Sequence, residues 1–431
     1  MKLLVLGAYG LIGQSVARAL HAAGHDVTGL GRSARLGRAL VPGIAWVEAD
    51  LAQMTAPAQW AGLIAGLDGV VNCAGLLDAG RTEMDKVQHQ SIAAAIAACE
   101  AQEVRRFIQI SAPDAREDSS TEFFRSKARA DQALKASALA WTIFRPGLVL
   151  APTVYGGTSL VRMLAAFPLI QPVALADARI QIVAVDDVAA AVVQAVDGSA
   201  AKAAEGGDFD LVADPALALS DVIAATRRWL GFPAARWTLA LPDALGFAAA
   251  RMGDLAGLLG WRPALRTPGL QVLSANVVGE ARAWEDLTGR RLKGLQAVLA
   301  ARPSTQQDRI AARAGLIFPL LLVTLAGFFI ATGVIALFQF DRAVAQLPAS
   351  FALAPALVLG GALADIALGC LMLVRKTTRP ALVGAAGLSL AYVIAGSVIT
   401  PDLWTDPLGP LLKALPVIVL AIGLWAMAEP R

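Results

Sequence analysis

Residues 2–13, KLLVLGAYGLIG, set the architecture of the N-terminal half of the chain. Residues 2–6 are a short apolar run typical of a buried strand, and three evenly spaced glycines follow at once: Gly7, Gly10 and Gly13. A helix is then expected to about residue 23, and a second strand at about 26–30. A strand, a glycine turn, a helix and a strand in this order are the context that a dinucleotide fingerprint requires.

Each glycine of this run has its own expected task. Gly7 permits a tight turn, Gly10 lets the backbone approach a pyrophosphate, and Gly13 lets helix and strand pack closely. The start of the helix adds unpaired N–H groups and a positive dipole end for the phosphates. The sequence therefore predicts a dinucleotide site formed by Gly7, Tyr9, Gly10, Leu11, Ile12 and Gly13.

The end of the second strand favours one cofactor over the other. NAD-binding proteins place an acidic residue there to hold the ribose hydroxyl, whereas this chain has Arg32 and Ser33, with Arg35 and Arg38 close behind. A guanidinium can bind a 2′-phosphate through two hydrogen bonds. The sequence thus favours NADP(H) over NAD(H), the alternative being that the arginines form a solvated loop.

Four further strands are expected at about 45–48, 69–72, 107–110 and 141–144, with helices between them. This alternation predicts an α/β fold with a Rossmann-type, doubly wound parallel sheet, which binds ligands at the carboxyl ends of its strands. The candidate site residues after those ends are Asp50, Leu51, Cys73, Ala74, Gly75, Ser111 and Pro146.

Charged residues are unevenly distributed along the chain. They make up 16% of the 431 residues, but only 12 of the 119 from residue 313 onward. Four apolar runs in this tail, at about 314–338, 351–374, 380–400 and 408–428, reach the roughly 20 residues that span a bilayer. We therefore predict a C-terminal four-helix transmembrane bundle in contact with lipid, with four buried core helices as the alternative.

Basic residues flank these spans asymmetrically. The side that carries both termini has Arg302, Arg309, Arg313, Arg375, Lys376, Arg379 and Arg431. The positive-inside rule then predicts a multi-pass protein of a bacterial inner membrane, with both termini and the N-terminal head in the cytoplasm. Asp365, within the second span, suggests either a proton- or quinone-linked site or a carboxyl hydrogen-bonded to a neighbouring helix.

Composition argues against several other classes of protein. The net charge of +3 is small and suggests no nucleic-acid partner. The three cysteines and three histidines are scattered, so neither a disulfide framework nor a metal site is expected. The oligomeric state is left open.

The head resembles the short-chain dehydrogenase/reductase superfamily, in its atypical or extended branch. The matching residues are the three loop glycines, Asp50-Leu51, 72–75, Ser111, Lys127, 145–147 and 185–188. Within that branch the head looks most like the group related to the accessory nucleotide-binding subunit of respiratory complex I, which includes proteins linked to ubiquinone synthesis.

The tail resembles a DoxX-type membrane module. The implied domains are an NAD(P)-binding domain at 1–300 with a substrate lobe at about 151–300, a linker at 301–312 and a membrane domain at 313–431.

The superfamily's chemistry depends on a Tyr-x-x-x-Lys pair and on a serine after the fifth strand. The resemblance implies that Lys127 binds the nicotinamide ribose and that Ser111 orients the substrate, but the tyrosine position is Phe123. Phenylalanine has no proton to give. The superfamily's helix-borne Asn also lacks an obvious match, His89 or Gln90 being nearest, and Tyr155 is a remote candidate for a replacement hydroxyl.

Two functions therefore compete. The first is a membrane-anchored, NADP(H)-binding oxidoreductase that acts on a small lipophilic or quinone-like substrate. The second is a catalytically impaired nucleotide sensor or assembly factor, linked through the resemblance to the respiratory chain or ubiquinone metabolism. Phe123 motivates the second, since losing a general acid–base group costs about a hundredfold to ten-thousandfold in rate.

Overall fold

The computed structural model describes the chain except for residues 78–79, 154–155, 199, 349, 408 and 429–431. The chain divides into two compact units. The first, here called the head, comprises Met1–Gly253 and Ala264–Arg309, and the second, the tail, comprises Asp254–Pro263 and Ile310–Arg431.

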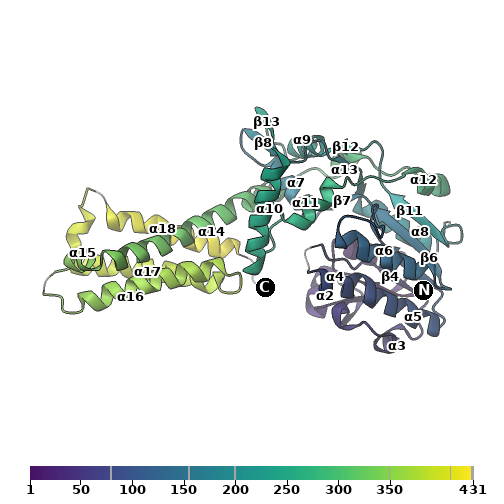
Figure 1. Ribbon diagram of the computed structural model, residues 1–431, viewed down its shortest axis with the longest axis horizontal. Coiled ribbons are helices and arrows are strands. Elements are labelled where there is room, and N and C mark those ends of the chain that lie inside the picture. The colour runs from purple at the N-terminus through teal and green to yellow at the C-terminus, as the bar shows by residue number, and fades with distance from the viewer. Residues whose placement is uncertain (78–79, 154–155, 199, 349, 408, 429–431) are drawn as a thin grey trace. The chain divides into compact units, whose positions relative to one another are not determined.

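A seven-stranded sheet in which every pairing is parallel forms the centre of the head (Figure 1). Its order is β11-β6-β5-β4-β1-β2-β3. The bounds are β1 Lys2–Leu6, β2 Asp26–Gly31, β3 Ala45–Glu48, β4 Gly69–Asn72, β5 Arg106–Ile110, β6 Ala140–Pro146 and β11 Gly207–Leu211. The predicted doubly wound sheet is confirmed, and the strand order reverses between β1 and β4, where such sheets bind ligands.

Helices cover both faces of this sheet. They are α1 Gly13–Ala22, α2 Ala34–Leu40, α3 Ala61–Ile64, α4 Arg81–Asp85, α5 Ser91–Ala101, α6 Glu122–Lys135 and α8 Val185–Val196. Leu3 and Val5 of β1 pack with α1 and α8 in one buried cluster, whereas Leu4 and Leu6 pack with α5 and α6 in another. Because successive strand residues point to opposite faces, the continuous apolar run of β1 is what a strand buried on both sides requires.

The remainder of the head is a smaller lobe of strand pairs and helices. Its strands are β7 Leu148–Leu150, β8 Ile170–Val173, β9 Arg179–Ile180, β10 Ile182–Ala184, β12 Leu217–Ala218 and β13 Trp237–Ala240. Its helices are α7 Gly156–Ala165, α9 Leu219–Trp229, α10 Asp243–Leu258, α11 Thr267–Ser274, α12 Arg282–Thr288 and α13 Leu295–Ala300. The last residues of α10 are assigned to the tail.

Four helices of the tail are long and apolar enough to cross a membrane. They are α14 Gln306–Phe338, α16 Ala354–Leu373, α17 Thr378–Ile399 and α18 Pro410–Met427, with the short α15 Phe340–Ala345 after the first. This confirms the expected set of four membrane-capable helices. Helix α14 begins within the segment predicted as a linker, because residues 306–313 contain good helix formers despite their polarity.

Close helix packing in the tail surrounds Asp365, which is 8% exposed. The Tyr392 hydroxyl of α17 donates to one carboxylate oxygen of Asp365 (3.1 Å), and Thr332 of α14 lies 3.4 Å from the other. A Cβ atom at Gly361 would lie 2.9 Å from the Tyr392 hydroxyl, so glycine makes room for this contact. Asp365 is thus hydrogen-bonded to neighbouring helices, as one of the two interpretations expects. Its proton- or quinone-linked role stays a prediction.

Candidate functional site

The glycine loop between β1 and α1 has the shape that its sequence predicts. Gly7 has φ +67°, and a Cβ atom there would lie 2.9 Å from the Ala74 backbone. The Gly10 N–H donates to the Gly7 carbonyl (2.8 Å), and any side chain at Gly13 would overlap that same carbonyl oxygen. Substitution at either end of the loop therefore has to move backbone.

Helix α1 begins directly after this loop without a side-chain cap. Its cap residue, Ile12, makes no side-chain cap, and its first turn contains no acidic residue. The first N–H groups of a helix lack partners within the helix and favour anions. A tight glycine loop followed by an uncapped helix start fits the pyrophosphate of a dinucleotide.

Tyr9 extends from the loop across the end of β2. Its ring stacks on Trp46 with centroids 5.9 Å apart, and its hydroxyl accepts a hydrogen bond from the Arg32 N–H (3.0 Å). Gly31 is required beneath it, because a Cβ atom there would overlap the tyrosine ring. The loop and the end of β2, which the sequence proposed separately as cofactor contacts, are thus brought together.

Opposing charges lie beyond β2. The Arg32 side chain is exposed and, among the residues that the structure describes, has no hydrogen-bond or ion-pair partner. Ser33 caps α2, its hydroxyl accepting from the Leu36 N–H (3.3 Å). The Glu48 carboxylate accepts from the Ala34 N–H (2.9 Å) at the same helix end. Arg32 favours a 2′-phosphate and Glu48 opposes one. Sequence reasoning overlooked Glu48 because it ends β3, one strand later than the expected acidic position, and only strand pairing places it beside Gly31.

Two predicted contacts after β3 serve the local structure. The Asp50 side chain accepts from the Ala52 N–H (3.0 Å), which caps a short 3-10 turn. Leu51 is 7% exposed and belongs to the core beneath the sheet. The cofactor contact predicted for Leu51 therefore does not involve an exposed side chain.

The loop after β4 is held by buried amides. Asn72, 1% exposed, donates to Gln109 (2.8 Å) and accepts from the Ala74 N–H (2.9 Å), which fixes residues 73–75. Burial raises the pKa of the Cys73 thiol to about 12, so the sulfur is protonated and not a nucleophile. Residues 73–75 therefore contribute to the candidate site through the path of their backbone rather than through a reactive side chain.

Lys127, which the resemblance assigns to the nicotinamide ribose, is a buried residue of α6. Its ammonium donates to the Ile110 carbonyl (2.8 Å) and lies 5.7 Å from the centroid of the Phe123 ring. A Cβ atom at Gly75 would be 3.7 Å from that nitrogen, so β4, β5 and α6 meet here. Burial lowers the pKa of Lys127 to about 8, with the nearby Asp131 carboxylate opposing the shift.

Ser111 is hydrogen-bonded through its hydroxyl to a buried carboxylate. Its hydroxyl lies 2.6 Å from Asp131 and donates to it, and Arg145 pairs with the same carboxylate oxygen at 3.1 Å. Burial raises the pKa of Asp131 even though Arg145 and Ser111 oppose the shift. Pro146 ends β6, where it is in register with Leu211 of β11. The substrate-orienting role of Ser111 stays a prediction.

Gln88 is a residue that the sequence did not identify. It lies in a π-helical turn, Lys86–Gln90, its amide N–H donating to Ser126 (2.8 Å) and its oxygen accepting from the Leu76 N–H (3.1 Å). This 2% exposed side chain joins α6 to the loop after β4, while the His89 ring bonds to the Asp85 carboxylate of its own helical segment. Helical π-bulges recur at functional sites. The sequence does not reveal this bulge, so it gave no signal that Gln88 would be the buried residue.

Tyrosine hydroxyls do not contact Lys127 among the described residues. Tyr9 lies at the β2 end, Tyr392 belongs to the tail, and Tyr155 lies outside the residues that the structure describes. Phe123 is therefore the aromatic side chain beside the lysine.

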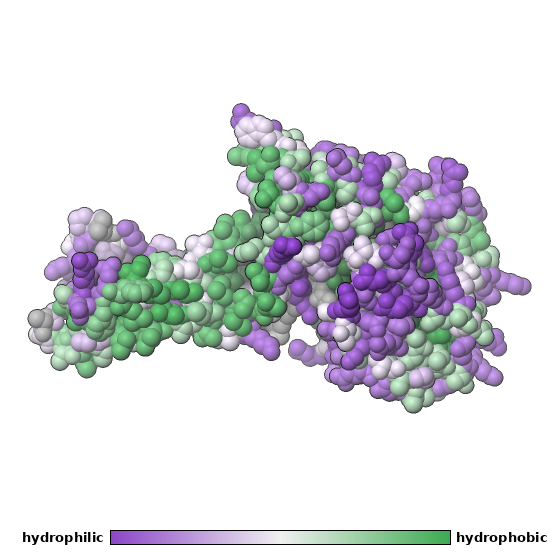
Figure 2. All heavy atoms as spheres, viewed as in Figure 1, coloured by the Kyte–Doolittle hydropathy of each residue, from purple (hydrophilic) through white to green (hydrophobic). Residues whose placement is uncertain are grey.

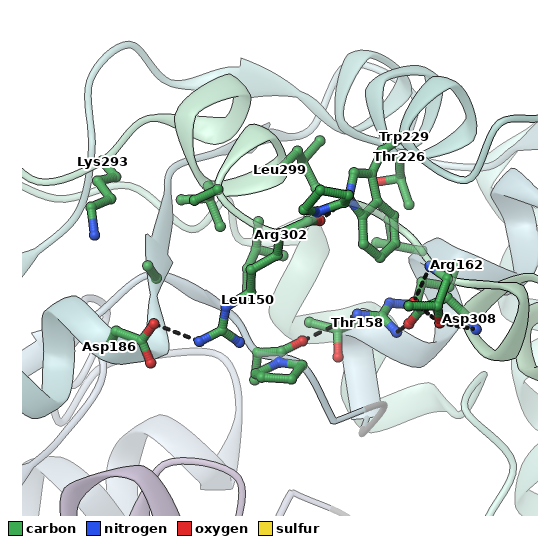
Figure 3. Close-up of a pocket in the computed structure, with 18 residues that line it drawn as sticks. Leu150, Thr158, Arg162, Asp186, Thr226, Trp229, Lys293, Leu299, Arg302 and Asp308 are labelled. Atoms are coloured by element: carbon green, nitrogen blue, oxygen red, sulfur yellow. Dashed lines mark hydrogen bonds and ion pairs between the residues drawn. The ribbon is translucent and has the colours of Figure 1, made fainter. Parts of the chain in front are cut away.

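A cavity of about 250 Å³ lies in the lobe (Figure 3). Its wall is largely apolar, with Leu150, Val161 and Leu299 among its residues, and it is crossed by the ion pairs Arg162–Asp308 (3.0 Å) and Arg302–Asp186 (2.5 Å). The loop after β7 forms part of this wall, and its Thr153 accepts a hydrogen bond from Gln14 in the first turn of α1 (3.4 Å). A hydrogen bond thus links the loop that lines the cavity to α1, the helix after the glycine loop.

Replacing Lys127 with methionine is expected to stabilise the head at pH 7. The folded-state pKa of about 8 lies below the ordinary 10.5, so the buried ammonium costs on the order of 3 kcal/mol below pH 8. Between pH 8 and 10.5 the unfolded chain holds more protons, so wild-type stability rises with pH and the advantage of the variant shrinks. Thermal unfolding of the detergent-solubilised full chain from pH 7 to 9.5 measures this.

The exposed Lys202 provides the matched control. Lys202→Met is expected to leave both the melting temperature and its pH dependence nearly unchanged. A Lys127→Met variant less stable than wild type at pH 7 would mean that the ammonium is not buried at a cost.

Comparisons with known proteins agree with the division of the chain into a head and a tail. A family model described as NAD(P)H-binding matches residues 7–199, and the model of the DoxX-like family matches residues 297–422. No curated protein sequence matches the chain.

Several solved structures share the fold of the head. An NADPH-dependent quinone oxidoreductase from Escherichia coli, complexed with NADPH, is 19% identical over 69% of this chain and 99% of its own, with a TM-score of 0.54. The Bordetella bronchiseptica enzyme WbmH in complex with NAD+ is 19% identical over 69% and 96%, with a TM-score of 0.53. A short-chain dehydrogenase/reductase superfamily protein from Agrobacterium tumefaciens with bound NAD has a TM-score of 0.51 at 17% identity, over 73% and 98%.

Proposed function

We propose that this chain, which joins an NAD(P)H-binding domain to a DoxX-like domain, is a membrane-bound oxidoreductase that reduces a lipophilic, quinone-like acceptor with NADP(H). The single observation that carries the proposal is that the glycine loop and Lys127 are present while Phe123 stands in place of the proton donor. The glycine loop and Lys127 favour cofactor binding, while Phe123 argues against ordinary carbonyl reduction.

A bound nicotinamide cofactor supplies a hydride to its acceptor. In this proposal the loop glycines and the start of α1 hold its pyrophosphate, and Lys127 holds its ribose. A quinone needs the hydride and one proton to become a quinol, and that proton can come from water, so no tyrosine is required. The lobe cavity, with its apolar wall, is the proposed acceptor site.

We also propose that the head lies in the cytoplasm, beneath a bacterial inner membrane. The support is the excess of arginine and lysine at the α14 start and between α16 and α17.

The test is NADPH oxidation by the full chain in proteoliposomes, with a panel of quinones and carbonyl compounds. Quinone-dependent turnover that a cofactor-binding variant lacks would support the proposal. Absence of turnover with every acceptor, despite cofactor binding, would overturn it in favour of the second function.

That second function is a nucleotide-binding sensor or assembly factor, and Phe123 is the specific observation in its favour. It predicts that NADPH raises the melting temperature without being oxidised.

Cofactor choice can be tested through Arg32. Arg32→Ala is expected to weaken NADPH binding by about 10- to 100-fold, because a charge-assisted hydrogen bond contributes about 1.5–3 kcal/mol. NADH binding should change little, since NADH has no 2′-phosphate. The control variant is Arg105→Ala. Arg105 is exposed and immediately precedes β5, so it lies at the amino ends of the parallel strands, whereas Arg32 follows the carboxyl end of β2. Equal losses for both cofactors would remove the argument for NADP(H).

A further inference from the structure

Helix α10 exposes a stripe of large apolar residues and buries a narrower face of small ones. Leu245, Met252 and Leu255 are 55%, 68% and 56% exposed, and at 100° per residue they fall on one stripe. The opposite side carries Gly246 and Ala250, both buried. A Cβ atom at Gly246 would lie 2.5 Å from the Ala174 Cβ, so this narrow face is the one packed on the lobe. A helix of an ordinary soluble domain has the reverse arrangement.

The strand before α10 continues the apolar surface. Trp237 and Leu239 are 57% and 50% exposed, and both lie in β13, which pairs with β8. Leu169, immediately before β8, is 68% exposed. The Leu175 N–H donates to Asp243 (3.1 Å), which ties the start of α10 to the segment after β8. We call β8, β13 and α10 together the apolar ledge; Figure 2 shows hydrophobic residues over this part of the head.

Basic residues border the ledge. The Arg236 guanidinium lies 4.7 Å from the centroid of the Trp237 ring, and Arg251 is exposed one residue before Met252. Tryptophan and arginine together are typical of the layer where lipid headgroups meet acyl chains.

The residues that follow α10 pack within the tail. The Trp261 indole donates to the Leu373 carbonyl (2.7 Å) at the end of α16, and the Arg375 N–H donates to the Leu259 carbonyl (2.9 Å). The Arg375 guanidinium lies 5.0 Å from the centroid of the Trp261 ring. These contacts are made at the ends of membrane-capable helices, which is where the bilayer interface falls. The chain that leaves α10 therefore runs directly into residues that pack against the end of α16.

We propose that the apolar ledge is a membrane-binding element that lies in the interfacial layer of the bilayer. Acyl chains contact Trp237, Leu245 and Met252, while Arg236 and Arg251 contact anionic lipid headgroups. Large exposed apolar patches indicate a partner, and three observations favour lipid as that partner. They are the inverted helix, the basic border, and the continuity of α10 with residues that cap α16. Amphipathic interfacial helices bind membranes in this way.

The experiment measures the surroundings of single spin labels on the full chain in nanodiscs containing anionic phospholipid. Labels are attached to Leu245→Cys and Met252→Cys in a background in which Cys73, Cys99 and Cys370 are alanine. Leu36→Cys on α2 is the matched control, because Leu36 is an exposed leucine (46%) outside the ledge. Each label is tested with oxygen, which concentrates in lipid, and with a water-soluble nickel chelate.

The ledge labels are expected to be several-fold more accessible to oxygen than to the nickel chelate, and the Leu36 label should show the reverse. Two results would overturn the proposal. One is nickel accessibility at Met252 equal to that at Leu36, which means solvent. The other is shielding of Met252 from both reagents, which means that protein, such as a second copy, covers the ledge. An unchanged melting temperature in detergent verifies that each variant is folded.

Discussion

Replacing Phe123 with tyrosine is expected to raise NADPH-dependent carbonyl reduction by about 100- to 10,000-fold, the usual contribution of a general acid. The Phe123 ring lies 5.7 Å from the Lys127 ammonium, so a hydroxyl on this ring would sit beside a cation that stabilises its ionised form. Quinone reduction should change little, because in our proposal it draws its proton from water. Steady-state rates of wild type and variant with aldehydes, ketones and quinones measure the difference.

The control for this variant is Phe123→Leu, which removes the ring without adding a hydroxyl. It should show no carbonyl reduction above the wild-type background. If Phe123→Tyr leaves every carbonyl rate unchanged while still binding NADPH, Phe123 does not face the reacting atoms, and the role implied by the superfamily pattern would have to be abandoned.

Adding one carbon at Gly13 is expected to abolish useful cofactor binding. The new Cβ of Gly13→Ala would overlap the Gly7 carbonyl oxygen, and both are backbone positions that cannot rotate away. Overpacking of this kind costs about 1–3 kcal/mol, and the displaced loop also loses its close approach to the pyrophosphate. We expect the NADPH dissociation constant to rise about 100-fold or more, measured by titration of the solubilised protein.

Gly62→Ala provides the matched substitution, because a Cβ atom at Gly62 meets nothing within 4 Å. It should leave cofactor affinity unchanged. Normal NADPH binding by Gly13→Ala would show that the loop does not hold the pyrophosphate. The same variant serves as the cofactor-binding control in the quinone assay.

Most of the head could be predicted from local pattern. The expected strands at 45–48 and 69–72 have the bounds that the structure shows, and those at 107–110 and 141–144 differ by one or two residues. This accuracy comes from short β-branched and apolar runs that end at glycine or polar residues. The predicted end of β6 is two residues too early, because Arg145 and Pro146 resemble loop residues. Pairing with β11 keeps both residues in the sheet.

The side-chain partners of the candidate site were harder to foresee. The serine after β5 suggested a substrate contact, yet Ser111 donates to Asp131, which lies on α6. His89 and Gln90 were the expected neighbours of the site, whereas the π-helical turn directs Gln88 to the loop after β4. In both cases the outcome depends on which way a side chain turns within a packed interface, which residue spacing alone does not encode.

The sequence by itself determined the parallel sheet, the glycine loop, the missing tyrosine and the four membrane-capable helices. Each of these depends on residue type and short-range spacing, which act through backbone conformation and hydrophobic burial. Only the tertiary structure decided that the Glu48 carboxylate lies at the start of α2, near Arg32, and that α10 exposes its large apolar face. These features depend on contacts between segments distant in sequence, where packing selects one of several arrangements that the local sequence allows.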